Sequence, residues 1–224
     1  MFLLRKAIID PNWLSSEEKR LLDEWANSIP GFIRDGCANP KNYVNAPVKL
    51  LFVLKEVNGG QDWDLREFMN DGCRPQTWNV IARWIEGIFN IDHDYSWDEM
   101  QNDNDRRRKL YIPQVSAVNV KKTSGGNVAN SDLIQNSVEN NKDHLRQQLQ
   151  LYQADIIVLC GTEKQYQTAI RNKPNWKMTS RGIWYYIDDN NSIVISFSHP
   201  EARTKECFLY YGLIDAVKEI IQKN

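Results

Sequence analysis

The sequence has few of the features that mark metal-binding or disulfide-stabilised proteins. Its 224 residues include four cysteines, Cys37, Cys73, Cys160 and Cys207, which lie far apart and form no Cys-x-x-Cys pair. This spacing argues against a zinc ribbon, a cluster-binding site and a small secreted disulfide scaffold. We therefore expect neither a metal nor a cofactor, and we expect Cys160, in an apolar run, to be a buried thiol.

Long hydrophobic runs and an excess of one charge are also missing. The apolar N-terminal stretch is interrupted by Arg5, Lys6 and Asp10, so it is too short for a signal peptide or a membrane span. A cytoplasmic protein without a membrane partner fits this pattern. Lys and Arg number 28 against 29 Asp and Glu, so any contact with nucleic acid must come from a local patch.

The chain does have the content of a folded globule. Hydrophobic residues make up 42% of it, with eight Trp, nine Tyr and seven Phe, which excludes a disordered chain. A length of 224 residues suits one sizeable core, so we expect residues 1–224 to form a single domain.

Short apolar, β-branched runs predict buried strands at residues 48–54, 115–120, 155–160 and 193–197, with helical patterns between them. Residues 183–187 are expected to form a hairpin with the last of these strands. The alternation predicts the α/β class. We expect a three-layer α/β/α sandwich around a central, mostly parallel four-stranded sheet.

Two local patterns carry further expectations. Ser15-Ser16-Glu17-Glu18 is typical of a capping box that opens a helix. Arg106-Arg107-Arg108-Lys109 is a run of like charges, which usually forms a solvated helix face or loop.

The four main strands end in polar or glycine corners, at Glu56, Asn119, Gly161 and His199. Parallel strands share a direction, so these corners are expected along one edge of the sheet, where open α/β folds bind their ligands. The sequence thus predicts a cleft that combines a carboxylate, an amide, a glycine turn and an imidazole.

The motifs at these corners resemble the uracil-DNA glycosylase superfamily, most closely its iron–sulfur-type branch. The similar segments run in the same order, over roughly residues 48–217: Leu54 to Gly59 with Glu56, Gly72-Cys73-Arg74-Pro75 followed by Trp78, Val118-Asn119-Val120-Lys121-Lys122, Val158-Leu159-Cys160-Gly161-Thr162, and Ser198-His199-Pro200-Glu201-Ala202-Arg203. The resemblance implies a uracil-DNA glycosylase-like fold and hydrolysis of the N-glycosidic bond of uracil or a related base in DNA.

The resemblance also implies roles for single residues. As catalytic residues, His199 would donate a hydrogen bond to the departing base, and Glu56 or Asn58 would position or activate water or offset an oxocarbenium-like sugar. The implied substrate-binding residues are Trp78 to stack on the flipped base, Asn119 to read its amide edge, Lys121 and Arg203 to hold phosphates, and Pro200 beside His199.

Each of these residue types also has a structural explanation. Trp78 lies on an apolar helical stripe that is typical of a core, and Asn119 could satisfy a loop amide. Glu56 could form an ion pair with Lys55, and Lys121 could lie at a solvated corner.

The sequence departs from the family pattern in ways that leave two functions open. Lys55 and Val57-Asn58 replace the Gly and Ala-Pro of the first motif, Glu201 replaces the Ser after His-Pro, and the cluster cysteines are absent. The first function is a glycosylase-like hydrolase. The alternative is a non-catalytic module on the same fold that binds a nucleobase, nucleotide or nucleic acid through the local cleft.

Overall fold

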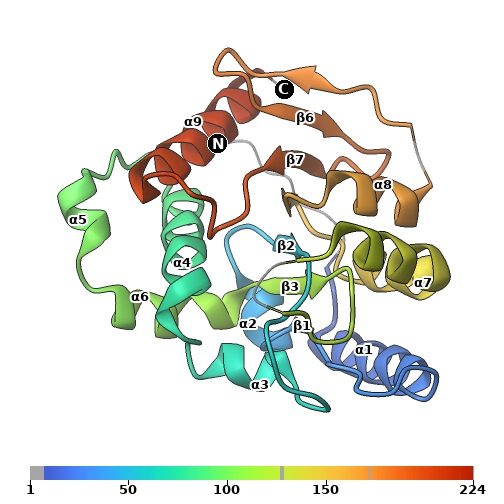
Figure 1. Ribbon diagram of the computed structural model, residues 1–224. Coiled ribbons are helices and arrows are strands. Elements are labelled where there is room, and N and C mark those ends of the chain that lie inside the picture. Colours follow the sequence, from blue (N-terminus) through green and yellow to red (C-terminus); the bar gives the residue numbers. More distant parts are fainter. Residues whose placement is uncertain (1–7, 127–128, 172, 224) are drawn as a thin grey trace.

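The computed structural model describes residues 8–126, 129–171 and 173–223, and the first seven residues of the N-terminal apolar stretch lie outside it (Figure 1). In the described chain one sheet of seven strands has the order β1-β3-β2-β4-β7-β6-β5. The strands are β1 Gly36–Cys37, β2 Leu50–Leu54, β3 Ser116–Asn119, β4 Ile156–Cys160, β5 Lys177–Met178, β6 Trp184–Ile187 and β7 Ile193–Phe197.

The four adjacent strands β3, β2, β4 and β7 are the predicted ones, and they are parallel to one another. Leu54 lies opposite Asn119, Val53 opposite Leu159, and Cys160 opposite Phe197. The sheet as a whole is mixed, which corrects the expectation of a four-stranded sheet: β1, β6 and β5 add antiparallel pairs at its two sides. The predicted hairpin of β6 and β7 is confirmed.

Helices cover both faces of the sheet, which gives the three layers visible in Figure 1. Helices α4 and α9 lie on one face, and α1, α7 and α8 lie on the other. The helices are α1 Pro11–Ala26, α2 Pro40–Asn45, α3 Leu65–Asn70, α4 Pro75–Phe89, α5 Trp97–Gln101, α6 Asn104–Tyr111, α7 Ser131–Leu151, α8 Glu163–Ile170 and α9 Glu206–Lys223, with a short 3-10 turn at Ile112–Gln114.

The central position of strand β2 explains why its sequence is apolar without alternation. Leu50 and Phe52 face the core under α4 and α9, whereas Leu51 and Val53 face the core under α1 and α7. All four side chains are fully buried. A central parallel strand has helices on both sides, so it exposes no face to water. Each such side chain contributes about 1.5–3 kcal/mol by leaving water.

Helix α1 begins earlier than the sequence pattern indicated. Its N-cap is Asp10, whose carboxylate accepts hydrogen bonds from the backbone N–H groups of Asn12 and Trp13, and Pro11 occupies the first helical position. The expectation of a capping box at residues 15–18 was therefore wrong, because Asp10 and Pro11 already provide a complete start signal.

The run of basic residues 106–109 is only partly solvated. Arg107 and Arg108 are buried, which contradicts the expectation of a solvated face. Arg107 forms an ion pair with Glu86 of α4 and donates to the backbone carbonyls of Met100 and Asn102. Its fixed set of donors joins α6 and the preceding turn to α4, as a guanidinium in a buried site requires.

In the described residues, no helix combines the length and apolar character that crossing a membrane requires.

Gly36 in β1 provides a test of how tightly the edge of the sheet packs. Its φ is +133°, and an added Cβ would lie 2.2 Å from the Tyr152 hydroxyl and 2.3 Å from Glu18 Oε1. We expect Gly36→Ala to lower the free energy of unfolding by about 2 kcal/mol or more, through backbone strain and loss of these buried contacts. Urea unfolding measures it.

Gly126→Ala is the matched control, because an added Cβ at Gly126 meets no heavy atom within 4 Å. Equal unfolding midpoints for Gly36→Ala and the wild type would contradict the packing described for β1.

Candidate functional site

The carboxyl ends of β3, β2, β4 and β7 lie in this order along one edge of the sheet. Asn119 ends β3, Glu56 follows β2, Gly161 follows β4 and His199 follows β7. The structure thus places the four corners along a shared edge. The side chains, however, divide into three separate groups.

The first group is a nearly enclosed ion pair. Lys121 Nζ lies 2.6 Å from Glu56 Oε2 and also donates to the carbonyls of Thr123 and Ser124, at 3.2 and 2.9 Å. Only 9% of the Glu56 side chain and 12% of that of Lys121 are exposed. Gly125 packs so closely that an added Cβ would lie 2.1 Å from the Glu56 carboxyl carbon. Glu56 therefore pairs with Lys121.

Asn58 lies at the outer end of the same arrangement. It is exposed and forms a parallel bridge with Gly125, whose N–H donates to the carbonyl of Val57 at 2.8 Å. These contacts extend the pairing of β2 and β3 into the loops that follow them. Asn58 is thus an exposed residue of the loop after β2, two positions beyond Glu56.

The second group surrounds Asn119 at the other side of β3. Asn119 is buried, and both its backbone N–H and its Nδ2 donate to Asp35 Oδ2, at 2.8 and 3.2 Å. The other Asp35 oxygen, Oδ1, accepts from Lys122 Nζ at 2.5 Å and from Gln148 Nε2 at 3.0 Å. The amide of Asn119 is therefore directed at Asp35. Burial lowers the pKa of Lys122, and the charge of Asp35 opposes this shift.

The third group lies around His199. Its Nδ1 accepts a hydrogen bond of 3.1 Å from the backbone N–H of Glu201. An accepting Nδ1 cannot carry a proton, so the neutral ring has its proton on Nε2, which is left as a donor. Burial lowers the pKa of His199 below 6.5, Glu201 opposes this shift and Lys55 adds to it. The ring is therefore neutral at pH 7.

Gly161 lies close to both Lys55 and His199. Its φ is +69°, and an added Cβ would lie 3.6 Å from Lys55 Cε and 4.0 Å from the backbone nitrogen of His199. The corner after β4 thus brings Lys55 to the neighbourhood of His199. This corner combines a neutral donor, a cation and, through Glu201, an anion.

The remaining predicted site residues differ in exposure. Trp78 is 5% exposed and belongs to the core under α4, which fits its structural explanation. Pro200 is buried next to His199, and Arg203 is exposed. Within the described part of the chain, no hydrogen bond or ion pair joins the side chains of Glu56, Asn119 and His199 to one another.

Several residues of these groups were missed by the sequence patterns. Asp35, Gln148 and Thr77, whose hydroxyl donates to Glu201, have no motif or periodicity that marks them. The hydrogen bonds Asn119–Asp35, Gln148–Asp35 and Thr77–Glu201 span 84, 113 and 124 positions. Lys55 was named only as a departure from a motif and as an ion-pair partner for Glu56. Their roles depend on tertiary contacts, which spacing along the chain does not reveal.

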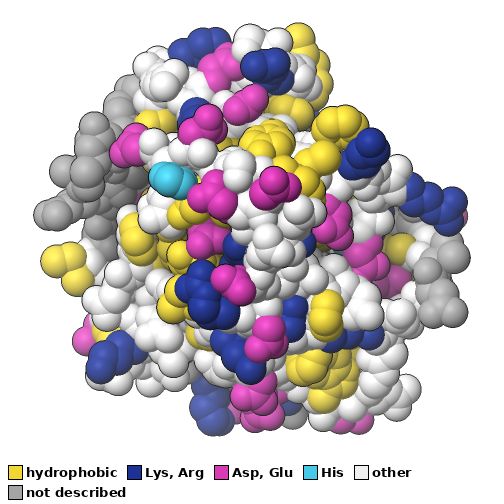
Figure 2. Space-filling model, turned by 90° about the vertical axis from the view of Figure 1, so that its left-hand side faces the viewer, with side chains coloured by type: hydrophobic (Ala, Val, Ile, Leu, Met, Phe, Trp, Pro, Cys, Tyr) yellow, Lys and Arg dark blue, Asp and Glu magenta, His cyan; other side chains and the backbone are white. Residues whose placement is uncertain are grey.

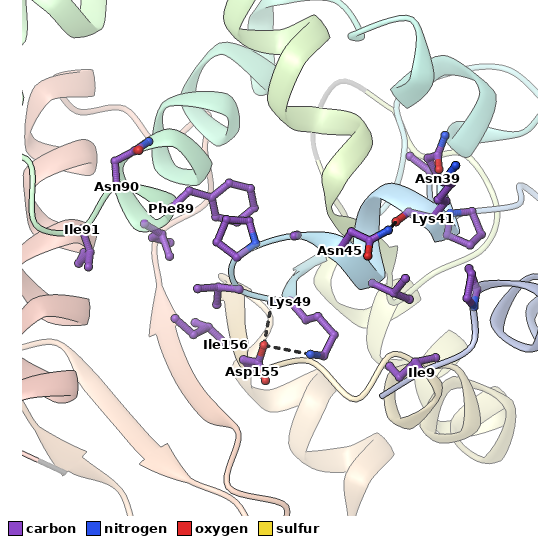
Figure 3. A pocket seen from close by; sticks show the side chains of 18 of the residues that line it. Ile9, Asn39, Lys41, Asn45, Lys49, Phe89, Asn90, Ile91, Asp155 and Ile156 are labelled. Carbon is purple, nitrogen blue, oxygen red and sulfur yellow. Dashed lines mark hydrogen bonds and ion pairs between the residues drawn. The ribbon is translucent and has the colours of Figure 1, made fainter. Parts of the chain in front are cut away.

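The described residues contain no group of three or more His, Cys, Asp or Glu side chains able to hold a metal ion. A broad groove of about 1910 Å³ lies at the opposite, amino-terminal edge of the strands (Figure 3). There Asp155 Oδ2 accepts from the backbone N–H of Lys49 at 2.8 Å and lies 3.4 Å from its Nζ, among apolar side chains such as Phe89 and Ile156. The groove is thus separate from the His199 corner.

The surface on the side of α4, α5, α6 and α9 carries no large basic field. Figure 2 shows Lys and Arg side chains interspersed with Asp and Glu side chains over this face. This distribution agrees with the balanced composition of the chain. Electrostatic attraction of a polyanion over this face is correspondingly weak.

Comparison of the sequence with protein-family models and with curated proteins gives no match.

The state of His199 can be measured directly. We expect its imidazole to titrate with a pKa below 6.5 and to hold the Nε2–H tautomer at neutral pH, because burial disfavours the charged ring and Nδ1 is an acceptor. As pH falls through 6.5, the unfolded chain binds its proton first, so this group lowers stability in acid. Long-range ¹H–¹⁵N NMR reports both properties, with assignment by His199→Gln. An Nδ1–H tautomer would contradict the hydrogen bond from Glu201.

The Asp35 group allows a second measurement. We expect Asp35→Ala to lower the free energy of unfolding by about 3–5 kcal/mol, because it leaves the buried Lys122 ammonium without its counter-ion. Urea unfolding measures the loss. Glu139→Ala, which removes a more exposed ion pair of α7, is the control and should unfold near the wild-type midpoint. Similar losses for the two variants would sink the role given to Asp35.

Proposed function

We propose that the chain is a uracil-DNA glycosylase-like hydrolase that cleaves the N-glycosidic bond of uracil or a related base in DNA. The observation that carries this proposal is the hydrogen bond from the Glu201 N–H to His199 Nδ1 at the end of a parallel strand, which leaves Nε2–H as the donor of the neutral ring. The parallel strands with helices on both faces, and the ordered motifs at their ends, support the fold assignment.

The chemistry needs such a donor. When the bond between sugar and base breaks, negative charge develops on the base and its carbonyl oxygen. A preorganised N–H group that meets this oxygen stabilises the transition state more than the ground state, and one such donor is worth about 10²–10³ in kcat. A neutral ring can donate this bond and needs no prior protonation at pH 7.

The other residues have narrower roles in this proposal. Asn58, exposed in the loop that follows β2, would contact water at this edge of the sheet. Glu56 offers a negative charge to an oxocarbenium-like sugar, although Lys121 offsets much of it. Because Lys121 is engaged with Glu56, phosphate contact falls to Arg203, which is exposed. The base would have to leave the DNA stack, at a cost of a few kcal/mol.

A specific observation favours a second candidate, a non-catalytic module that binds a nucleobase or nucleotide. Glu56 is paired with Lys121 at 2.6 Å, and the amide of Asn119 is bound to Asp35. Lys121 Nζ occupies Oε2 of the Glu56 carboxylate, which leaves less of it to accept a proton from water, whereas a hydrogen bond from the His199 donor can hold a carbonyl group without hydrolysis. This candidate would bind the same kind of ligand without hydrolysing it.

Uracil release from single- and double-stranded oligonucleotides separates the two. We expect the wild type to release uracil and His199→Gln to lower kcat by about 10²–10³. His93→Gln, which changes an exposed histidine elsewhere, should retain the wild-type rate. Binding of a uracil-containing oligonucleotide, followed by fluorescence anisotropy, accompanies the assay.

Binding without release by the wild type would replace the hydrolase with the binding module. Absence of both release and binding would contradict both candidates. Equal rates of uracil release for the wild type and His199→Gln would contradict the hydrolase as proposed.

A further inference from the structure

The segment that carries His199 is fastened to helix α4 at two points. In the turn of residues 198–205, the Thr77 hydroxyl donates to Glu201 Oε1. Just beyond this turn, Arg83 Nη1 lies 2.5 Å from Glu206 Oε2 at the start of α9. Both contacts join α4 to the chain immediately after β7. The backbone around His199 is therefore held from outside its own turn.

Glu201 connects Thr77 to the imidazole. Its carboxylate accepts the hydrogen bond from Thr77, while its backbone N–H donates to His199 Nδ1 at 3.1 Å. The turn is closed by a further bond of 2.9 Å, from the N–H of Ala202 to the carbonyl of His199. A single residue thus transmits the position of α4 to the ring.

We infer that Thr77 is a positioning residue for His199: by fixing the Glu201 side chain, it keeps the Glu201 N–H directed at Nδ1 and the proton of the ring on Nε2. This inference deepens the proposed function, and only its kinetic part rests on that function.

Helix α4, to which the Glu201 side chain is hydrogen-bonded, is rigidly packed. Thr77 lies in the first turn of α4, where a carboxylate interacts favourably with the helix dipole. Further along the helix, Ile81, Trp84 and Ile85 are completely buried. Glu201 itself is exposed, so without Thr77 its side chain would be free to take other rotamers in water. The hydroxyl therefore supplies a constraint that Glu201 lacks by itself.

The position of the proton decides which ligand atom the ring can serve. With the proton on Nε2 the ring offers a donor to a ligand, whereas the other neutral tautomer offers an acceptor and loses the bond from Glu201. The charged groups that influence the ring are Glu201 in its own turn and Lys55 after β2. The N–H of Glu201 donates directly to Nδ1, so we assign the choice of tautomer to this hydrogen bond.

The test compares two substitutions that separate the hydroxyl group from the shape of the side chain. Thr77→Val keeps the shape of the side chain and removes the hydroxyl, while Thr77→Ser keeps the hydroxyl. Long-range ¹H–¹⁵N NMR of the His199 ring should show the Nε2–H tautomer in the wild type and in Thr77→Ser, and a mixture with the Nδ1–H tautomer in Thr77→Val. In the uracil-release assay, kcat of Thr77→Val should fall about three- to tenfold with KM unchanged, which is the size expected for one lost hydrogen bond.

An unchanged tautomer in Thr77→Val would overturn the inference, whatever the activity. A changed tautomer in a protein that releases no uracil would support the positioning role and count against the proposed hydrolase alone. If Thr77→Val does not fold, as judged by circular dichroism, Glu201→Pro provides the second test. It removes the N–H donor while leaving Thr77 in place, so it should populate the Nδ1–H tautomer, and retention of the wild-type tautomer would again overturn the inference.

Discussion

The carboxylate of Asp35 is the interaction on which one side of the sheet depends. It accepts four hydrogen bonds, two from Asn119 and one each from Lys122 and Gln148, and so joins the edge of β1 to the end of β3 and to α7. Asp35 and Lys122 are both fully buried, and charges in such a place persist only when paired and hydrogen-bonded. The end of β3 is accordingly fixed by electrostatics as well as by packing.

This arrangement divides the carboxyl edge of the sheet into two parts with different chemical capacity. At the end of β3 the amide of Asn119 is already bound by a carboxylate, and next to it Glu56 is bound by Lys121. At the end of β7, by contrast, Nδ1 of the His199 ring accepts a hydrogen bond, and among the described residues Nε2–H is left as a donor. A site that must stabilise charge on a ligand needs donors that the fold has not already used. The β7 corner meets this condition better than the β3 corner.

The sequence could predict the four parallel strands β3, β2, β4 and β7, because helices on both faces of the sheet require a continuous apolar run in each of them. From their parallel direction it also followed that Glu56, Asn119 and His199 lie along one edge. It could not predict β1 and β5, since a strand of two residues leaves no periodicity. The burial of Arg107 was equally hidden, because its counter-ion Glu86 comes from another helix. Alternation reports which face of an element is buried, but not which distant side chain neutralises a charge.

The place of His199 at the edge of the sheet and the location of its ring proton therefore have separate physical causes. The first follows from a strand end in the sequence, the second from one backbone N–H in the folded turn. The two proposed functions, hydrolysis and simple binding, both require this donor. They differ in whether they need the carboxylate of Glu56. Lys121 holds Oε2 of that carboxylate, so a hydrolytic role has to use Oε1 or follow the opening of the ion pair. Because the pair is almost enclosed, its opening costs both Coulomb attraction and packing, which makes the state of Glu56 the point where the two functions diverge.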